Sequence, residues 1–166
     1  SGLKTQPWYP LRDYHGLLFA YLGPPGAVPD FVAYDVMEEL DQGERIVADD
    51  SSLGGGGPRE LDFNWLQHFE NVLDPFHVPI LHARFSGVQF NEEMGIIPEV
   101  RFGYTPDGVA AYSVRDLPNG RRLYRMTETV FPNLRVVASP KMNAMGPSRI
   151  LGWVVPRDDT HFVIFS

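Results

Sequence analysis

The stretch from Asp62 to His82, DFNWLQHFENVLDPFHVPILH, constrains the fold of this chain more than any other part of its sequence. Its first half carries apolar residues at the three-to-four residue spacing of an amphipathic helix with one buried face. Pro75 and Pro79 follow, and prolines stop such a helix from continuing regularly. We therefore expect a helix that packs on one side and breaks before His82. The residues predicted to face the core are Trp65, Leu66, Phe69, Val72, Leu73 and Phe76.

The polar side of this helix leads into Asp74, His77 and His82, and a bent backbone would bring both imidazoles to one point. Three interpretations compete. The first is structural, with a solvated helix surface and two histidines in ordinary hydrogen bonds. The second is a zinc hydrolase, but its histidines stand four residues apart with an acid between them, whereas residues five apart point about 140° apart on a regular helix. The third is an iron site whose two histidines lie beyond the end of a helix.

Composition limits the metal chemistry. The chain of 166 residues has no cysteine, which excludes disulfides, thiolate zinc sites, a cysteine nucleophile and conventional iron–sulfur clusters within it. Any metal must be held by His, Asp, Glu or other oxygen ligands, a set that suits iron(II), manganese or zinc.

Charge and hydropathy exclude further classes. The net charge of -7, without any basic run, disfavours nucleic acid and anionic membrane surfaces as partners. No apolar run approaches the length of about 20 residues that spans a bilayer. The first residues lack the charged, apolar and small-residue segments of a signal peptide, so we expect none. We expect a cytoplasmic protein, and its hydrophobic content of 43% is sufficient for one domain core.

The second half of the chain predicts consecutive antiparallel strands separated by turn signals. Thr105-Pro106-Asp107-Gly108 is predicted as a hairpin turn in which Gly108 takes positive φ. The fold class is thus α+β, an antiparallel sheet of about six strands with a helix across one face. The expected strands are residues 96–104, 109–115, 122–130, 134–138, 150–155 and 161–165, with a loop over 84–91.

The first half is less regular. An apolar strand within LLFAYLGPPG ends at a Gly-Pro-Pro-Gly turn, residues 27–35 form an extended connection, and a strand is expected around 44–48. The glycines of 51–58 form a plain loop, because a phosphate-binding loop would need a following Lys-Ser/Thr. The segment 141–147, KMNAMGP, either lines a substrate pocket or is a loop, and we favour the loop.

The string NWLQHFENVLDPFHVPILH closely resembles the iron-ligand segment of the Rieske-type non-haem iron aromatic-ring-hydroxylating oxygenases, in their large (alpha) subunit. In that family Asp-x2-His-x4-His follows a helix with a Glu-Asn pair. The flanking text agrees, since YPLRDYHGLLFAYLGPP is similar to the passage out of the Rieske domain, and VFPNLRVV and WVVPRDDTHF resemble strands of the central sheet.

This resemblance implies roles for five residues. His77 and His82 would be two of three iron(II) ligands, and Asp74 a catalytic carboxylate that bridges a ligand histidine to a cluster-bound histidine of a neighbouring subunit. Such a partner would also fix the tautomer of the ligand histidine. Glu70 and Asn71 would support the ligands, with plain surface exposure as the alternative.

The resemblance also implies an architecture: a helix-grip (START-like) sheet, with residues 1–26 as the passage from a Rieske domain and 27–166 as part of the catalytic domain. The third ligand is a carboxylate on a later helix, which we expect beyond residue 166, so the chain is expected to be truncated at both ends. Asp158 and Asp159 match a turn and are expected to be solvated or capping. His15, His68 and His161 are expected to be structural or exposed.

The implied activity uses dioxygen and electrons from a reductase or ferredoxin to hydroxylate or O-demethylate an apolar, aromatic substrate at mononuclear iron. The [2Fe-2S] Rieske cluster would belong to the full-length protein, a homotrimer, and the fragment alone would be inactive. The alternative is a helix-grip module that binds an apolar ligand without chemistry and carries no iron. The sequence leaves mono- and dioxygenation undistinguished.

Overall fold

The computed structural model describes residues 8–50, 60–85, 90–138 and 149–166. The chain forms two compact units, Ser1–Ala48 and Asp49–Ser166. This division reflects the contacts within each unit. The assignment of residues 1–26 and 27–166 to different functional parts remains a prediction.

The first unit is built on a hairpin of β1 (Leu11–Tyr14) and β2 (Leu17–Ala20), which pair antiparallel. Its two-residue turn has positive φ at both His15 and Gly16, 52° and 87°, as in a tight hairpin turn. The Tyr14 side chain is buried against aromatic rings, and a short helix, α1 (Asp35–Glu38), follows.

The strand expected around residues 44–48 is absent, and residues 44–49 have no regular secondary structure. Val47 is exposed there, so no surface buries an apolar face of this segment. A strand needs such a surface or a paired neighbour to be stable.

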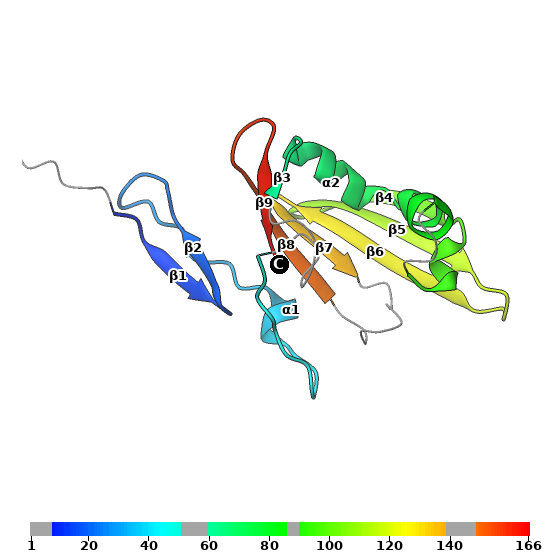
Figure 1. Ribbon diagram of the computed structural model, residues 1–166. Helices are drawn as coiled ribbons and strands as arrows, with labels where there is room; N and C mark the ends of the chain where they lie inside the picture. Colours follow the sequence, from blue (N-terminus) through cyan, green and yellow to red (C-terminus); the bar gives the residue numbers. More distant parts are fainter. Residues whose placement is uncertain (1–7, 51–59, 86–89, 139–148) are drawn as a thin grey trace, which may run out of the picture. The chain divides into compact units, whose positions relative to one another are not determined.

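The second unit is a seven-stranded antiparallel sheet in the order β3-β9-β8-β7-β6-β5-β4, with one long helix, and is drawn in Figure 1. Every pairing between neighbouring strands is antiparallel, which agrees with the α+β class. The six expected strands all form, and a short seventh joins the edge. The strands are β3 (Glu60–Leu61), β4 (Glu99–Thr105), β5 (Gly108–Asp116), β6 (Arg122–Val130), β7 (Leu134–Ala138), β8 (Arg149–Pro156) and β9 (Phe162–Phe165).

The turn between β4 and β5 has a different basis from the predicted one. Gly108 does not have positive φ and is the first residue of β5, paired with Thr105. A Cβ at this position would lie 1.9 Å from the carbonyl oxygen of Thr129 on β6. Glycine is therefore needed for the close approach of a neighbouring strand.

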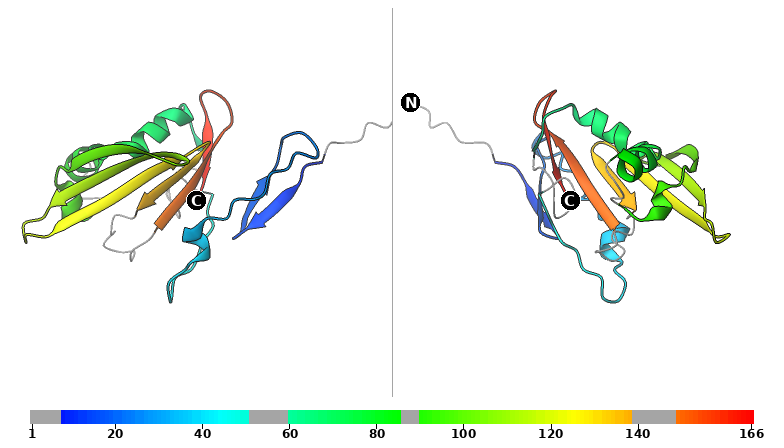
Figure 2. Two further views of the ribbon diagram at one scale, coloured as in Figure 1. Left: turned by 180° about the vertical axis from the view of Figure 1, so that it is seen from behind. Right: turned by 45° about the vertical axis from the view of Figure 1, so that its right-hand side comes forward.

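The helix α2 (Trp65–Leu73) lies across one face of the sheet, over β6, β7 and β8, as Figures 1 and 2 show. Phe69 is buried among Val154, Phe162 and Ile164 of the sheet, and this cluster forms the core of the unit. Burial of such side chains contributes roughly 1.5–3 kcal/mol each.

Two residues of the predicted apolar face are exposed, Leu66 and Phe76. Phe76 lies beyond the last residue of α2, because the helix ends at Leu73. The helical spacing that predicted its burial therefore does not extend to it. Leu66 is half exposed at the first turn of the helix.

The predictions for residues 51–58 and 141–147 lie in parts of the chain that are outside the described residues. Among the residues described, no helix is long and apolar enough to cross a membrane.

Candidate metal centre

The helix α2 ends where the two histidines begin. Asp74 is its C-terminal cap, and its carboxylate Oδ1 accepts a hydrogen bond from the backbone N–H of Phe76, 2.8 Å away. Pro75 lies between them and supplies no N–H. The chain then enters η1 (Val78–Phe85), a π-helix. Such segments occur frequently at functional sites.

This π-helix explains how two histidines five residues apart come together. Its backbone hydrogen bonds join residues five apart instead of four, so positions five apart return to the same side. The imidazole rings of His77 and His82 have centroids 5.4 Å apart and planes inclined by 74°. Pro79 lies in the first turn, where a helix tolerates a residue without an N–H. The histidines are therefore neighbours, although a regular helix would separate them.

The orientation of His77 is set by the backbone. Its Nδ1 bonds to the carbonyl oxygen of Asp74, and a carbonyl can only accept, so Nδ1 carries the proton. This leaves the lone pair of Nε2 free for a metal. A hydrogen bond to the opposite ring nitrogen is the usual support of a ligand histidine.

The environment favours the neutral form of His77. Burial lowers the pKa of His77 below its ordinary value, the bond to the Asp74 carbonyl opposes this, and the charges of His82 and Arg125 lower it further. A neutral imidazole is the form that binds a metal.

The other predicted site residues lie in different surroundings. Asp74 is half-buried, but it contacts His77 through its backbone carbonyl, while its carboxylate holds the N–H of Phe76. Glu70 and Asn71 are both exposed on α2. Their supporting role, like the bridging role of Asp74, remains a prediction.

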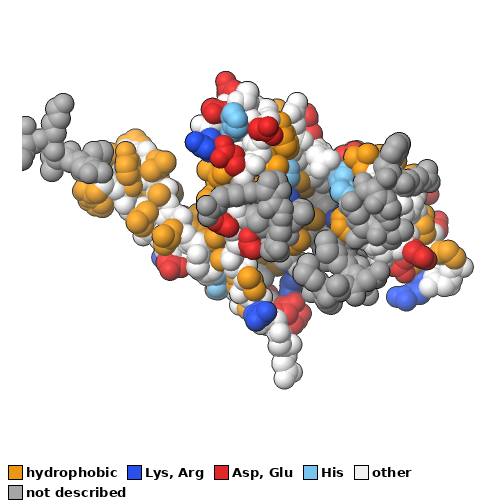
Figure 3. Space-filling view, viewed as in Figure 1, with side chains coloured by type: hydrophobic (Ala, Val, Ile, Leu, Met, Phe, Trp, Pro, Cys, Tyr) orange, Lys and Arg blue, Asp and Glu red, His pale blue; other side chains and the backbone are white. Residues whose placement is uncertain are grey.

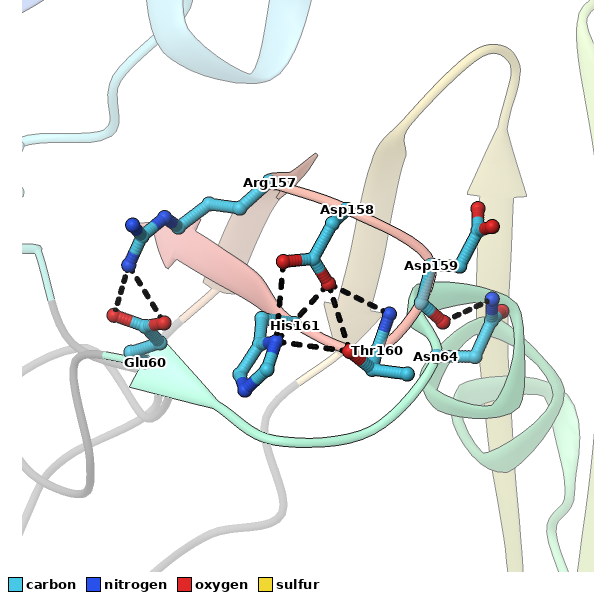
Figure 4. A network of polar contacts seen from close by, with 7 residues as sticks. All are labelled: Glu60, Asn64, Arg157, Asp158, Asp159, Thr160 and His161. Carbon is cyan, nitrogen blue, oxygen red and sulfur yellow. Dashed lines mark hydrogen bonds and ion pairs between the residues drawn. The ribbon is translucent and has the colours of Figure 1, made fainter.

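Asp158 and Asp159 lie in the loop between β8 and β9, where Figure 3 shows charged and histidine side chains gathered. The Asp158 carboxylate accepts hydrogen bonds from the N–H of Thr160, 2.8 Å, and from Nδ1 of His161, 3.0 Å (Figure 4). These bonds, the one from Thr160 first, lower the pKa of Asp158. The predicted capping role of Asp158 is confirmed. The backbone carbonyl of Asp159 accepts from Asn64, the N-cap residue of α2, at 2.9 Å.

The remaining histidines have structural contacts. His15 pairs with Glu38 at 3.2 Å, and His161 bonds to Asp158. His68 lies largely buried against the ring of Phe162, with centroids 5.4 Å apart, and its Nε2 has no hydrogen-bond partner within the described structure. Burial, with a smaller effect of the Arg135 charge, lowers the pKa of His68 to about 4.

The spacing of the two imidazoles is compatible with binding to one metal ion. Metal–imidazole bonds of about 2.1 Å place two ring centroids on one ion about 5 Å apart, which matches the distance between His77 and His82. Among the described residues, no group of three or more His, Cys, Asp or Glu side chains is placed to hold a metal. Among the described residues, His77 and His82 therefore remain the two candidate ligands.

The sheet face below α2 carries a feature that the sequence did not predict. Ile164 packs with the helix, Arg135 lies opposite Gly152 over Ile164, and Thr129 lies opposite Arg135. Arg125 is four residues before Thr129 on β6 and points to the same face. The buried polar and charged residues of the described structure all lie on this face: Ser113, Arg115, Thr127, Thr129 and Arg135.

Comparison with known proteins finds relatives among oxygenase subunits. No family model matches the chain. The alpha subunit of phenoxybenzoate dioxygenase from Ectopseudomonas oleovorans is 40% identical over 165 residues, which cover 95% of this chain and 39% of that protein. The chain belongs to the Rieske-type oxygenase family.

Two further relatives are oxygenase subunits. The oxygenase subunit of tert-butanol monooxygenase / tert-amyl alcohol desaturase from Aquincola tertiaricarbonis is 28% identical over 174 residues, 95% of this chain and 35% of that protein. The oxygenase subunit of 5,5'-dehydrodivanillate O-demethylase from Sphingobium sp. is 35% identical over 78 residues, 47% of this chain and 16% of that protein. The chain spans less than two fifths of the length of the curated Rieske-type oxygenase relatives that match most of it.

Proposed function

We propose that the chain is the part of a Rieske-type oxygenase catalytic domain that contributes His77 and His82 to a mononuclear iron(II) centre. The observation that supports this is the pair of imidazole rings 5.4 Å apart, one on His77 directly before the π-helix η1 and the other on His82 within it. The expected sheet is of the helix-grip type, and a carboxylate outside residues 1–166 completes the ligand set.

The residues of this chain position the metal. The Asp74 carbonyl holds the proton on Nδ1 of His77 and directs Nε2 outward. The Asp74 carboxylate holds the turn through the N–H of Phe76. In the assembled protein, a homotrimer, this carboxylate would bridge to a histidine of a neighbouring subunit's [2Fe-2S] cluster, and a buried path of this kind carries an electron with its proton.

The iron supplies dioxygen activation with electrons from a reductase or ferredoxin. Open positions on a centre with two histidines and one carboxylate suit this chemistry.

The proposed substrate is apolar and aromatic, and the reaction is a hydroxylation or an O-demethylation. The names of the relatives support this class, since they include a phenoxybenzoate dioxygenase and a dehydrodivanillate O-demethylase. Both names denote compounds that combine aromatic rings with a carboxylate.

Metal analysis of the full-length oxygenase tests the proposal. His77→Ala and His82→Ala are each expected to lower the mononuclear iron content at least about 10-fold, because loss of a ligand exceeds the 10–100-fold effect of losing its outer support. The matched control is His161→Ala, whose ring lies in the β8–β9 loop and bonds to Asp158. That variant is expected to retain its iron.

Retention of iron by both His77→Ala and His82→Ala would contradict the proposal. A wild-type protein that binds an aromatic ligand but carries no mononuclear iron would support the alternative, a binding module without chemistry.

A further inference from the structure

Two arginines on the helix-facing side of the sheet, Arg115 and Arg125, have no counter-charge among the residues that the structure describes. Arg115 on β5 is 1% exposed, and Arg125 on the adjacent β6 is half-buried. Neither forms an ion pair within the described structure, whereas Arg122 pairs with Asp116 and Arg157 with Glu60. Buried guanidinium groups are normally paired, because removing a charge from water is costly.

The hydrogen bonds of these arginines leave donors unused. Arg115 donates from Nε to the carbonyl of Ile96, 2.9 Å, and from Nη1 to the hydroxyl of Ser113, 3.3 Å. Its Nη2 is buried without a partner among the described residues. Arg125 donates from Nε to the carbonyl of Ala138, 3.1 Å. All these acceptors are neutral.

The two charges also act on one another. Burial first, and the charge of Arg115 second, lower the pKa of Arg125 to about 10. Two like charges in a buried region are stable together when an anion binds between them. The charge of Arg125 also contributes to lowering the pKa of His77, after burial and the charge of His82.

We infer that Arg115 and Arg125 form a subsite that binds a carboxylate of the substrate. The planar fork of a guanidinium matches a carboxylate with two parallel hydrogen bonds, and the unpartnered Nη2 of Arg115 is a donor for it. This inference rests on the proposed function and narrows its substrate class to aromatic carboxylates. The bound carboxylate would neutralise the pair and set the orientation of the aromatic ring at the iron.

The carboxylate has a second possible source, an acidic side chain of the longer polypeptide. Calorimetric titration of the full-length oxygenase, without oxygen and at neutral pH, separates the two sources. The probes are phenoxybenzoate and its neutral isostere phenoxybenzamide. Wild-type protein is expected to bind the carboxylate about 10-fold or more tightly than the amide, since hydrogen bonds to charged groups are the strong ones.

The decisive variant is Arg125→Gln. We expect it to lower affinity for phenoxybenzoate about 10-fold or more and to leave affinity for phenoxybenzamide within about two-fold. Arg125→Lys keeps the positive charge but lacks the planar guanidinium fork. Its affinity for phenoxybenzoate is expected to lie between those of wild type and Arg125→Gln. The matched control is Arg122→Gln on the same strand, because Arg122 is exposed and paired with Asp116 at 2.8 Å. It should change neither affinity.

Equal affinities of wild-type protein for phenoxybenzoate and phenoxybenzamide would overturn the inference. This measurement does not depend on the folding of any variant. A lower unfolding temperature of Arg125→Gln with both affinities unchanged would also overturn it, and would assign the carboxylate to the polypeptide. Iron content is measured on the same samples. Intact iron with no carboxylate preference refutes this subsite alone, whereas absent iron refutes the proposed function.

Discussion

The two ends of one sheet face differ sharply. At the β8–β9 end, Val154, Phe162 and Ile164 are fully buried and pack with Phe69 of α2. At the β5–β6 end, the same face buries arginines and hydroxyl groups. The same sheet face is thus an apolar core at its β8–β9 end and carries the positive charges of Arg115 and Arg125 at its β5–β6 end.

We attribute the stability of the fold to the apolar end of the sheet face and ligand binding to its polar end. The apolar end contributes to folding through area removed from water. The polar end costs free energy, because Arg115 and Arg125 have no counter-ion within the described part of the chain, and buried cations of this kind are destabilising. Such a cost is typical of places where a ligand completes the structure. The helical segments differ in the same way. The α-helix α2 packs on the apolar cluster, and the π-helix η1 comes after it in the chain.

The largest expected effect is at the apolar end. Phe162→Ala is expected to lower the free energy of unfolding by about 3–5 kcal/mol, the usual cost of an aromatic-to-alanine change in a core. Phe162 is fully buried and contacts Phe63 and His68. Urea unfolding followed by tryptophan fluorescence measures the change.

Phe165→Ala is the matched control for this prediction. Phe165 lies on the same strand but is 39% exposed and points to the opposite face. Its loss is expected to cost about 1 kcal/mol or less. Equal costs for the two variants would show that the apolar cluster is not the main source of stability.

Much of this fold was predictable from sequence. The strand β6 (Arg122–Val130) and β7 (Leu134–Ala138) were predicted with their observed bounds, because turn signals flank them closely. The pairing of His77 with His82 was also predicted from the two prolines. The segment 84–91 was predicted as a loop, yet its start belongs to η1, since π-helical hydrogen bonding has no sequence period that a helical pattern detects.

The positions of Arg115 and Arg125 on the inner face of the sheet were not predicted, although the alternation of residues along the strands indicates them. Arg115 and Arg125 occupy positions on β5 and β6 that alternate with exposed residues such as Tyr112 and Tyr124. Strand alternation places each arginine on the inner face once the core side is known. That side is defined only by α2 packing on the sheet, which is a tertiary contact.

A second prediction concerns His68, which lies between the two ends. Its folded pKa of about 4 is below the ordinary value of 6.5, so the unfolded chain binds the proton more readily. Its stabilising effect is therefore complete above pH 6.5 and is lost as the pH falls toward 4. Between pH 7.5 and pH 5, wild type is expected to lose about 2 kcal/mol more than His68→Gln. Urea unfolding at both pH values measures this, and identical losses would contradict the buried neutral imidazole.

The smallest expected effect concerns the ion pair of Arg157, an exposed arginine, in contrast to Arg115 and Arg125. Arg157 holds both carboxylate oxygens of Glu60, at 2.7 and 2.6 Å, yet the two side chains are 60% and 40% exposed. Water screens such a pair, so a double-mutant cycle with Arg157→Gln and Glu60→Gln is expected to give a coupling of about 0.5 kcal/mol that falls with added salt. A coupling of several kcal/mol would mean that the charge pair at the rim, and not the apolar cluster beneath it, holds β3 to β9. The conclusion that the apolar end of the sheet face is the main source of stability would then be wrong.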